Sequence, residues 1–183
     1  MELAVGRTEV PSGHRAERRL CARTRGVANL LSLSGRHGDA TEESTRARQL
    51  DPLDAMVHAI SSQLAFQRRD YSSASAHARQ AILIDSELWV GHAQLGQTLA
   101  QMGQTDLALQ SLAEGERLSG GNSKALSMRG YVLAKAGRVS EARVVLEELM
   151  KRGGEGYVPP YALALITPAS ATANRRSTPS KQH

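Results

Sequence analysis

Alanine recurs at intervals of 34 residues through the centre of this chain, and that period constrains the fold more than any other feature. The four alanines are Ala40, Ala74, Ala108 and Ala142. Twelve residues before each of them stands a small residue, in the row Ala28, Ser62, Gly96 and Gly130. Four residues after each stands a small or aliphatic one, in the row Ser44, Ala78, Leu112 and Leu146. The register holds over residues 21–156 without an insertion, which is typical of proteins that stack one supersecondary unit.

Each unit has the pattern of two helices joined by a short turn. In residues 89–122 the apolar spacing predicts a first helix from Trp89 to Met102, which Gly103 ends with a left-handed cap. Asp106 lies near the start of the second helix, where the helix dipole favours a carboxylate. Arg69-Asp70-Tyr71 replaces the glycine turn in the second unit, and Gly153-Gly154 is expected to end the fourth. The expected repeats are 21–54, 55–88, 89–122 and 123–156.

The small residues have a mechanical explanation. Gly96 facing Ala108 would let two antiparallel helices approach to about 8–10 Å. Leucine side chains would then fill the space between neighbouring repeats. Because a single helix pair cannot bury its own apolar face, stability must come from stacking. The sequence therefore predicts an all-α solenoid of antiparallel helix pairs.

Residues 89–122 resemble the tetratricopeptide repeat (TPR) in the pattern Trp89-x5-Leu95-Gly96-x2-Leu99-x8-Ala108-x3-Leu112-x2-Gly115. The resemblance covers 21–156 and implies a right-handed superhelix whose first helices line a concave face. Residues 157–166 resemble the opening of a partial fifth repeat. The repeats also resemble arrays that follow kinase, cyclase or winged-helix domains in bacterial signalling proteins. That likeness implies either a fragment of such a protein or a short gene derived from one.

Charge is distributed so that the repeats are nearly neutral. The net charge of +5 arises at the ends, because residues 51–156 sum to −1 whereas 1–50 and 157–183 each sum to +3. A nucleic-acid-binding face would gather its Lys and Arg on the folded part, so nucleic acid is disfavoured as a partner. We expect a basic N-terminal segment at 1–20, for which disorder is one interpretation, and a disordered basic tail at 167–183.

Targeting signals are not apparent in the sequence. The N-terminus has no apolar core of a secretory signal, and no run approaches the roughly 18 apolar residues of a membrane span. A single cysteine, Cys21, excludes an intramolecular disulfide and fits a reducing compartment. We expect a cytoplasmic protein that does not bind membranes.

No residue pattern points to catalysis. His58 and His92 occupy the same position in successive repeats, roughly 10 Å apart, which is too far for shared metal coordination at about 2 Å. Cys21 has no assignable base. Gly120-Gly121-Asn122 and Lys124 lack the strand and second glycine of a phosphate-binding loop. We therefore expect no enzymatic activity, no metal, no cofactor and no small-molecule substrate.

The first helices carry a polar pattern suited to binding. One row at the 34-residue register holds Asn29, Gln63, Gln97 and Tyr131, and a second, four residues later, holds Leu33, Gln67, Gln101 and Lys135. Side-chain amides offer donors and acceptors to an extended peptide backbone. In one branch of the family, groove lysines and asparagines bind the C-terminal carboxylate of a chaperone. This chain has Ala59, Ala93 and Ser127 where those lysines are expected, so that specificity is not carried over.

The leading functional hypothesis is a non-catalytic protein-interaction module, a scaffold or adaptor that binds a peptide or protein in its concave groove. The alternative is a self-associating structural fragment of a larger bacterial signalling protein. In that case homo-oligomers would form through the uncovered fifth-repeat residues Tyr161, Leu163, Leu165 and Ile166. Nucleic-acid binding through the basic tails is a third hypothesis, and catalysis is the least favoured.

Overall fold

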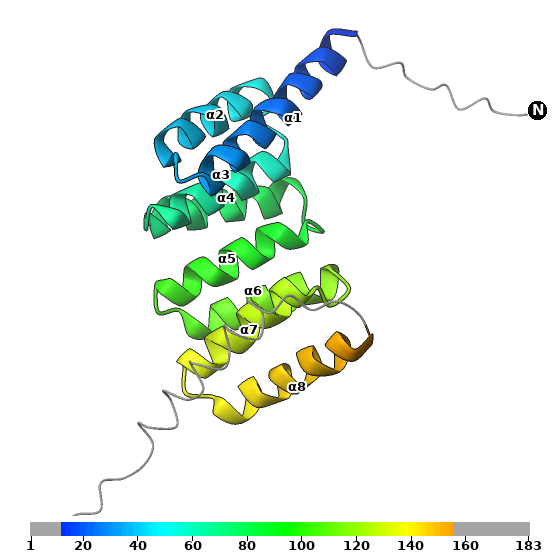
Figure 1. Cartoon of the computed structure of the whole chain (residues 1–183). Coiled ribbons are helices and arrows are strands. Elements are labelled where there is room, and N and C mark those ends of the chain that lie inside the picture. The colour runs from blue at the N-terminus through cyan, green and yellow to red at the C-terminus, as the bar shows by residue number, and fades with distance from the viewer. Residues whose placement is uncertain (1–11, 156–183) are drawn as a thin grey trace, which may run out of the picture.

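The computed structural model describes residues 12–155, and within them the chain forms eight α-helices and no strand (Figure 1). Their bounds are α1 Ser12–Leu33, α2 His37–Leu50, α3 Ala55–Gln67, α4 Tyr71–Ile84, α5 Trp89–Gln101, α6 Thr105–Leu118, α7 Ser123–Lys135 and α8 Val139–Glu155. None of these helices has the length and apolar character needed to cross a bilayer. The expected partial repeat at 157–166 and tail at 167–183 lie outside the described residues.

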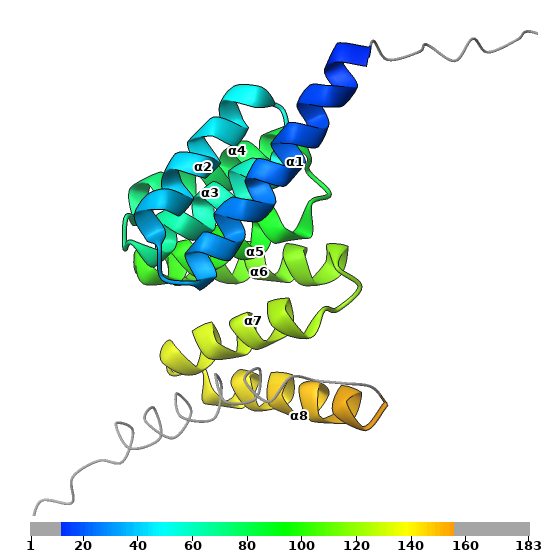
Figure 2. The ribbon, with the colours of Figure 1, turned by 45° about the horizontal axis from the view of Figure 1, so that its top comes forward.

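Helices pack in antiparallel pairs in chain order, from α1 and α2 at one end of the stack to α7 and α8 at the other (Figures 1 and 2). Successive first helices contact one another, α1 with α3, α3 with α5 and α5 with α7. Over residues 12–155 the second helices of successive pairs make no such contacts. First helices that touch while second helices spread apart place the first helices on the inner side of the curve. This is a TPR-like superhelix, and the predicted all-α architecture is confirmed.

The residues that repeat at 34 positions form the interior. The anchoring alanines Ala40, Ala74, Ala108 and Ala142 are all fully buried, and the earlier row of Ala28, Ser62, Gly96 and Gly130 is buried too. A Cβ on Gly96 would lie 2.9 Å from the Ala108 carbonyl oxygen, closer than side-chain carbons are found. The predicted close approach of helices at Gly96 is confirmed.

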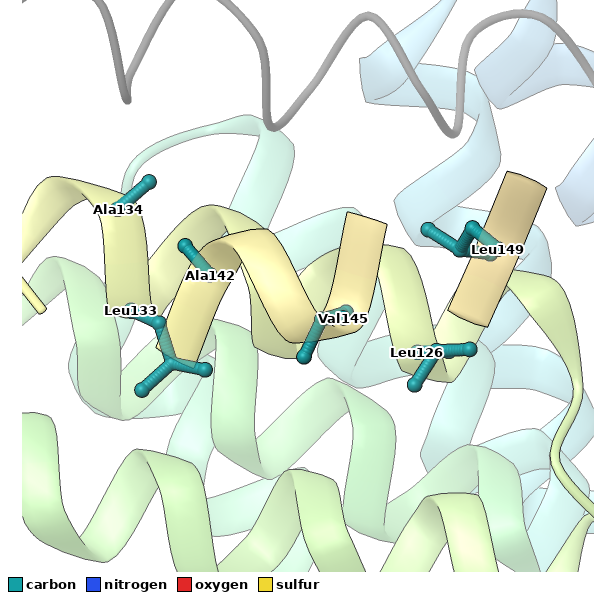
Figure 3. Packing of buried hydrophobic residues seen from close by; sticks show 6 residues of the cluster. All are labelled: Leu126, Leu133, Ala134, Ala142, Val145 and Leu149. Atoms are coloured by element: carbon teal, nitrogen blue, oxygen red, sulfur yellow. The ribbon is translucent and has the colours of Figure 1, made fainter. Parts of the chain in front are cut away.

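The last helix pair shows how the interior is built. Leu126, Leu133 and Ala134 of α7 pack with Ala142, Val145 and Leu149 of α8, and all six side chains are buried (Figure 3). Alanine at the helix crossings and leucine or valine beside them fill the space without aromatic side chains. The low aromatic content of the chain, 3%, is thus compatible with a packed core.

Polar caps begin several of the helices. The Asp54 carboxylate accepts hydrogen bonds from the backbone N–H groups of Met56 and Val57, and the Asp70 carboxylate accepts one from Ser73. The Asn122 side chain accepts from the backbone of Lys124. Each cap satisfies N–H groups that have no partner inside the helix.

The predicted helix end at Gly153-Gly154 is wrong, because α8 continues to Glu155. Arg152 explains why the last turn persists. Its guanidinium donates to the Gly121 carbonyl oxygen and forms an ion pair with Glu148 one turn earlier. These bonds tie the end of α8 to the loop between α6 and α7 and offset the low helix propensity of glycine. At the other end, α1 starts at Ser12, ahead of the repeat boundary expected at residue 21.

The turn between the helices of a pair has one backbone conformation in all four repeats. Gly35, Gly103 and Gly137 have φ of 76°, 78° and 80°, and Arg69 occupies the equivalent position at φ 61°. Arg69 is the one non-glycine residue with positive φ in the described part of the chain. The left-handed region costs a side chain bearing a Cβ about 1–2 kcal/mol.

We expect Arg69→Gly to raise the free energy of unfolding by about 1 kcal/mol, because glycine adopts this conformation without strain. Chemical denaturation measures the change. Arg68→Gly is the matched control, since Arg68 is also exposed but has φ of −79°. Its replacement should leave stability unchanged or lower it. Equal effects of the two variants would contradict the assignment of strain to residue 69.

Candidate binding surface

The two predicted rows lie along the first helices α1, α3, α5 and α7. In the first row Asn29, Gln63, Gln97 and Tyr131 are all half-buried. In the second row Gln67, Gln101 and Lys135 are exposed, and Leu33 is 70% exposed. Each residue therefore retains surface that a bound molecule could contact.

Hydrogen bonds connect the rows from one repeat to the next. Ser32 of α1 donates to the Gln67 Oε1 of α3, and Lys135 Nζ of α7 lies 3.4 Å from the Gln101 Oε1 of α5. Between α3 and α5, Gln94 Nε2 donates to Gln63 Oε1 at 3.4 Å. These bonds link neighbouring first helices in three separate groups. We call the polar residues of the first helices the amide strip: Asn29, Gln63, Gln67, Gln94, Gln97, Gln101, Tyr131 and Lys135.

Gln94 is the member that sequence reasoning missed. Its side chain is 2% exposed, accepts a hydrogen bond from Gln97 and donates to Gln63. The 34-residue register places Ile60 and Met128 at the equivalent positions, so the row reads as apolar. The signal in the sequence that could have identified Gln94 is that it is an amide at a position where the neighbouring repeats have Ile60 and Met128. Because a buried amide is costly unless bonded, Gln94 holds Gln63 and Gln97 in place.

The central part of this surface carries no formal charge. Neither α3 nor α5 contains Asp, Glu, Lys or Arg. Ala59, Ala93 and Ser127, at the positions where a carboxylate-binding groove would have lysine, are buried. The register extended to the first repeat places Arg25 there, but its Nη1 lies 2.6 Å from the Asp54 Oδ2. That arginine is therefore paired with a carboxylate of the same chain.

The repeated histidines have structural partners. His58 Nε2 lies 3.0 Å from the carbonyl oxygen of Pro52, and His92 Nε2 lies 2.9 Å from that of Ser86. In both cases the imidazole contacts a carbonyl six residues earlier, in the loop that enters its own helix. This contact fixes the loop between repeats and accounts for histidine at both positions. No cluster of three potential metal ligands occurs within residues 12–155.

Cys21 is equally part of the interior. Its side chain is 1% exposed, and its Sγ lies 3.6 Å from the Ala47 carbonyl oxygen and 3.7 Å from the Asp54 Oδ2. Burial, with a further contribution from the Asp54 and Asp51 carboxylates, raises the pKa of the Cys21 thiol to about 11. A thiol held protonated in this way is a poor nucleophile at neutral pH.

The stack of antiparallel helix pairs places this chain in the class of superhelical repeat proteins. No family model matches this chain, and no curated protein matches it in sequence. Among solved structures, the second TPR domain of human RPAP3, in complex with the HSP70 peptide SGPTIEEVD, aligns with a TM-score of 0.58 and 22% identity. That alignment covers 63% of this chain and 97% of the RPAP3 domain.

Two further structures show the same arrangement of helices. YrrB, a TPR protein with an unusual peptide-binding site, aligns with a TM-score of 0.59 and 21% identity over 84% of this chain and 78% of its own. An O-GlcNAc transferase of Thermobaculum terrenum aligns with a TM-score of 0.71 and 18% identity, over 78% of this chain and 27% of the enzyme. At these identities the matches establish the fold, which is that of TPR domains.

Proposed function

We propose that this chain is a non-catalytic protein-interaction module that binds an extended peptide segment of a partner protein along the amide strip. The observation that carries the proposal is the recurrence of amides on successive first helices, where Gln63 and Gln94 are joined by a hydrogen bond between repeats and Gln101 is bonded by Lys135 of the next repeat. The amides that are already hydrogen-bonded, such as those of Gln63 and Gln97, lose little side-chain entropy when a peptide docks on them. Its amides can both donate to and accept from a peptide backbone.

Charge narrows the kind of peptide that fits. The strip over α3 and α5 offers amides and no cation, so it suits a segment without charged side chains at its centre. The HSP70 peptide bound by the RPAP3 domain ends in two glutamates, a valine and an aspartate. We propose that this chain does not share that preference, because the lysine positions hold Ala59, Ala93 and Ser127 and the one arginine in the row is paired with Asp54.

The test uses peptides selected for binding to the full chain from a random-sequence display library. Replacing Gln63, Gln97 and Tyr131 with alanine should weaken the selected peptides about tenfold or more, since each substitution removes contacts worth about 0.5–1.5 kcal/mol. Titration by fluorescence anisotropy gives the dissociation constants, and circular dichroism checks that helicity is retained.

A matched control replaces three glutamines of the second helices, Gln49, Gln80 and Gln110, with alanine; this variant should bind as the natural chain does. Because Gln94 is buried against Gln63 and Gln97, a second groove variant changes only the exposed residues Gln67 and Gln101 and spares that network. If no peptide is selected, or if groove and control variants bind all selected peptides equally, the groove assignment is wrong.

A further inference from the structure

A small polar pocket lies away from the amide strip, where the second helices α2 and α4 spread apart over α3. Its volume is about 140 Å³, below the roughly 300 Å³ at which pockets begin to hold drug-sized ligands. The lining is basic and rich in hydroxyl groups, with Arg48, Arg68 and His77 beside Thr41, Ser44 and Ser61. A pocket of this size and composition suits a small anion or one anionic group of a larger molecule.

Arg48 is the central cation. Its Nη1 lies 2.6 Å from Ser61 Oγ and 3.4 Å from Ser44 Oγ, and its Nη2 lies 2.9 Å from Thr45 Oγ1. These hydroxyl groups orient the guanidinium but carry no negative charge. Within residues 12–155 Arg48 forms no ion pair, and burial lowers its pKa. A half-buried guanidinium with only neutral partners favours the arrival of an anion.

Arg68 adds a second positive charge to the pocket, and His77 adds a further one only when it is protonated. Arg68 Nη1 lies 3.4 Å from Thr41 Oγ1 and, in the described part of the chain, forms no ion pair. His77 faces Arg48 and His58, and burial with these two neighbours lowers its pKa. An anion in the pocket would oppose that effect. The one carboxylate at the rim is Asp70, which accepts the hydrogen bond of the Ser73 backbone as the cap of α4.

We propose that this pocket binds a phosphate group, held by the guanidinium groups of Arg48 and Arg68. Guanidinium is the side chain best matched to phosphate oxygens, to which it makes paired, charge-assisted hydrogen bonds. The pocket shares no residue with the amide strip, although α3 contributes to both. The phosphate group can come from a free ion or from a phosphorylated side chain of a partner.

The experiment titrates the full chain with inorganic phosphate and follows the imidazole signals of His77 and His92 by NMR. Saturable shifts at His77 with a rise in its pKa, and none at His92, are expected. Arg68→Gln should weaken binding about tenfold or more, because it removes a charge-assisted hydrogen bond. Asp70→Asn should strengthen it, since asparagine keeps the cap while the opposing charge is removed.

A phosphoserine peptide distinguishes the two sources of the phosphate group. If the peptide binds more tightly than the free ion, and loses that advantage without its phosphate, the source is a phosphorylated protein; otherwise the source is the free ion.

The matched control is Arg79→Gln. Arg79 donates to the serine four residues before it, as Arg48 does, but lies outside the pocket. The Arg79→Gln variant should bind phosphate with the same affinity as the natural chain. Arg48→Gln should abolish binding, and Arg68→Gln keeps the test decisive if that variant is unstable, because Arg68 is exposed. The proposal is overturned if His77 shows no saturable response to phosphate, or if Arg68→Gln and Arg79→Gln bind equally.

Discussion

Leu112→Ala is expected to lower the free energy of unfolding by about 2–5 kcal/mol. Leu112 is fully buried at the centre of a cluster formed by α5, α6 and α7, where it packs with Leu99, Ala108 and Val132. The substitution removes buried carbon atoms and leaves a cavity, because α5, α6 and α7 can move only partly to fill the space. Half-buried Tyr131 packs against the same cluster, so the loss should also loosen one residue of the amide strip.

Urea denaturation followed by circular dichroism measures this loss. Leu107→Ala on the same helix is the matched control, because Leu107 is 51% exposed and contributes little to the interior. We expect the control to change stability by less than about 1 kcal/mol. Comparable losses in the two variants would show that this cluster does not hold the central repeats together.

The buried residues could be predicted from the sequence because the two helices of every repeat pack in the same way. Ala108 recurs as Ala40, Ala74 and Ala142 because the same crossing of two helices recurs, and all four are fully buried. The turn at Arg69 followed from the register for the same reason. Its left-handed conformation is imposed by the two helices that the turn connects, although arginine does not favour it.

The amide strip was only partly predictable. The register identified the face that holds Gln63, Gln97 and Tyr131, since helical periodicity alone decides which positions share a face. It could not show that Gln94, on a face that is apolar in the other repeats, turns its amide toward Gln63. Such a bond depends on the distance between α3 and α5, which no pattern within one helix contains.

The basic pocket could not have been found from the sequence. Arg48, Arg68 and His77 come from α2, a turn and α4, and they follow no common spacing. They line one pocket because α2 and α4 both pack against α3 and leave a space between them. The degree of spreading depends on the superhelical geometry of the whole stack. A motif search has access to the residues but not to that geometry.

Gly96→Ala is expected to destabilise the chain by about 1–3 kcal/mol, even though alanine is the better helix former. The added Cβ would lie 2.5 Å from Leu112 Cγ and 2.9 Å from the Ala108 carbonyl oxygen. Gly26→Ala is the matched control, because Gly26 is also inside a helix but a Cβ there would meet nothing within 4 Å. That variant should raise the free energy of unfolding by about 0.5–1 kcal/mol. If the two variants change stability in the same direction, the close contact at Gly96 does not determine the effect of adding a Cβ there.

The second repeat indicates how this loss can be recovered. At the positions of Gly96 and Leu112 it has Ser62 and Ala78, and Ser62 Oγ donates to the Ala74 carbonyl oxygen at 2.8 Å. Ser62 is larger than Gly96 and Ala78 is smaller than Leu112, so the two repeats fill the space between their helices with different pairs of side chains. Combining Gly96→Ser with Leu112→Ala copies this solution. The double variant should lose about 1–2 kcal/mol less than the two single variants together, because neighbouring residues that share one space are not additive. Urea denaturation of the four proteins in this cycle measures the coupling, and additivity within about 0.5 kcal/mol would mean that the two positions do not exchange volume.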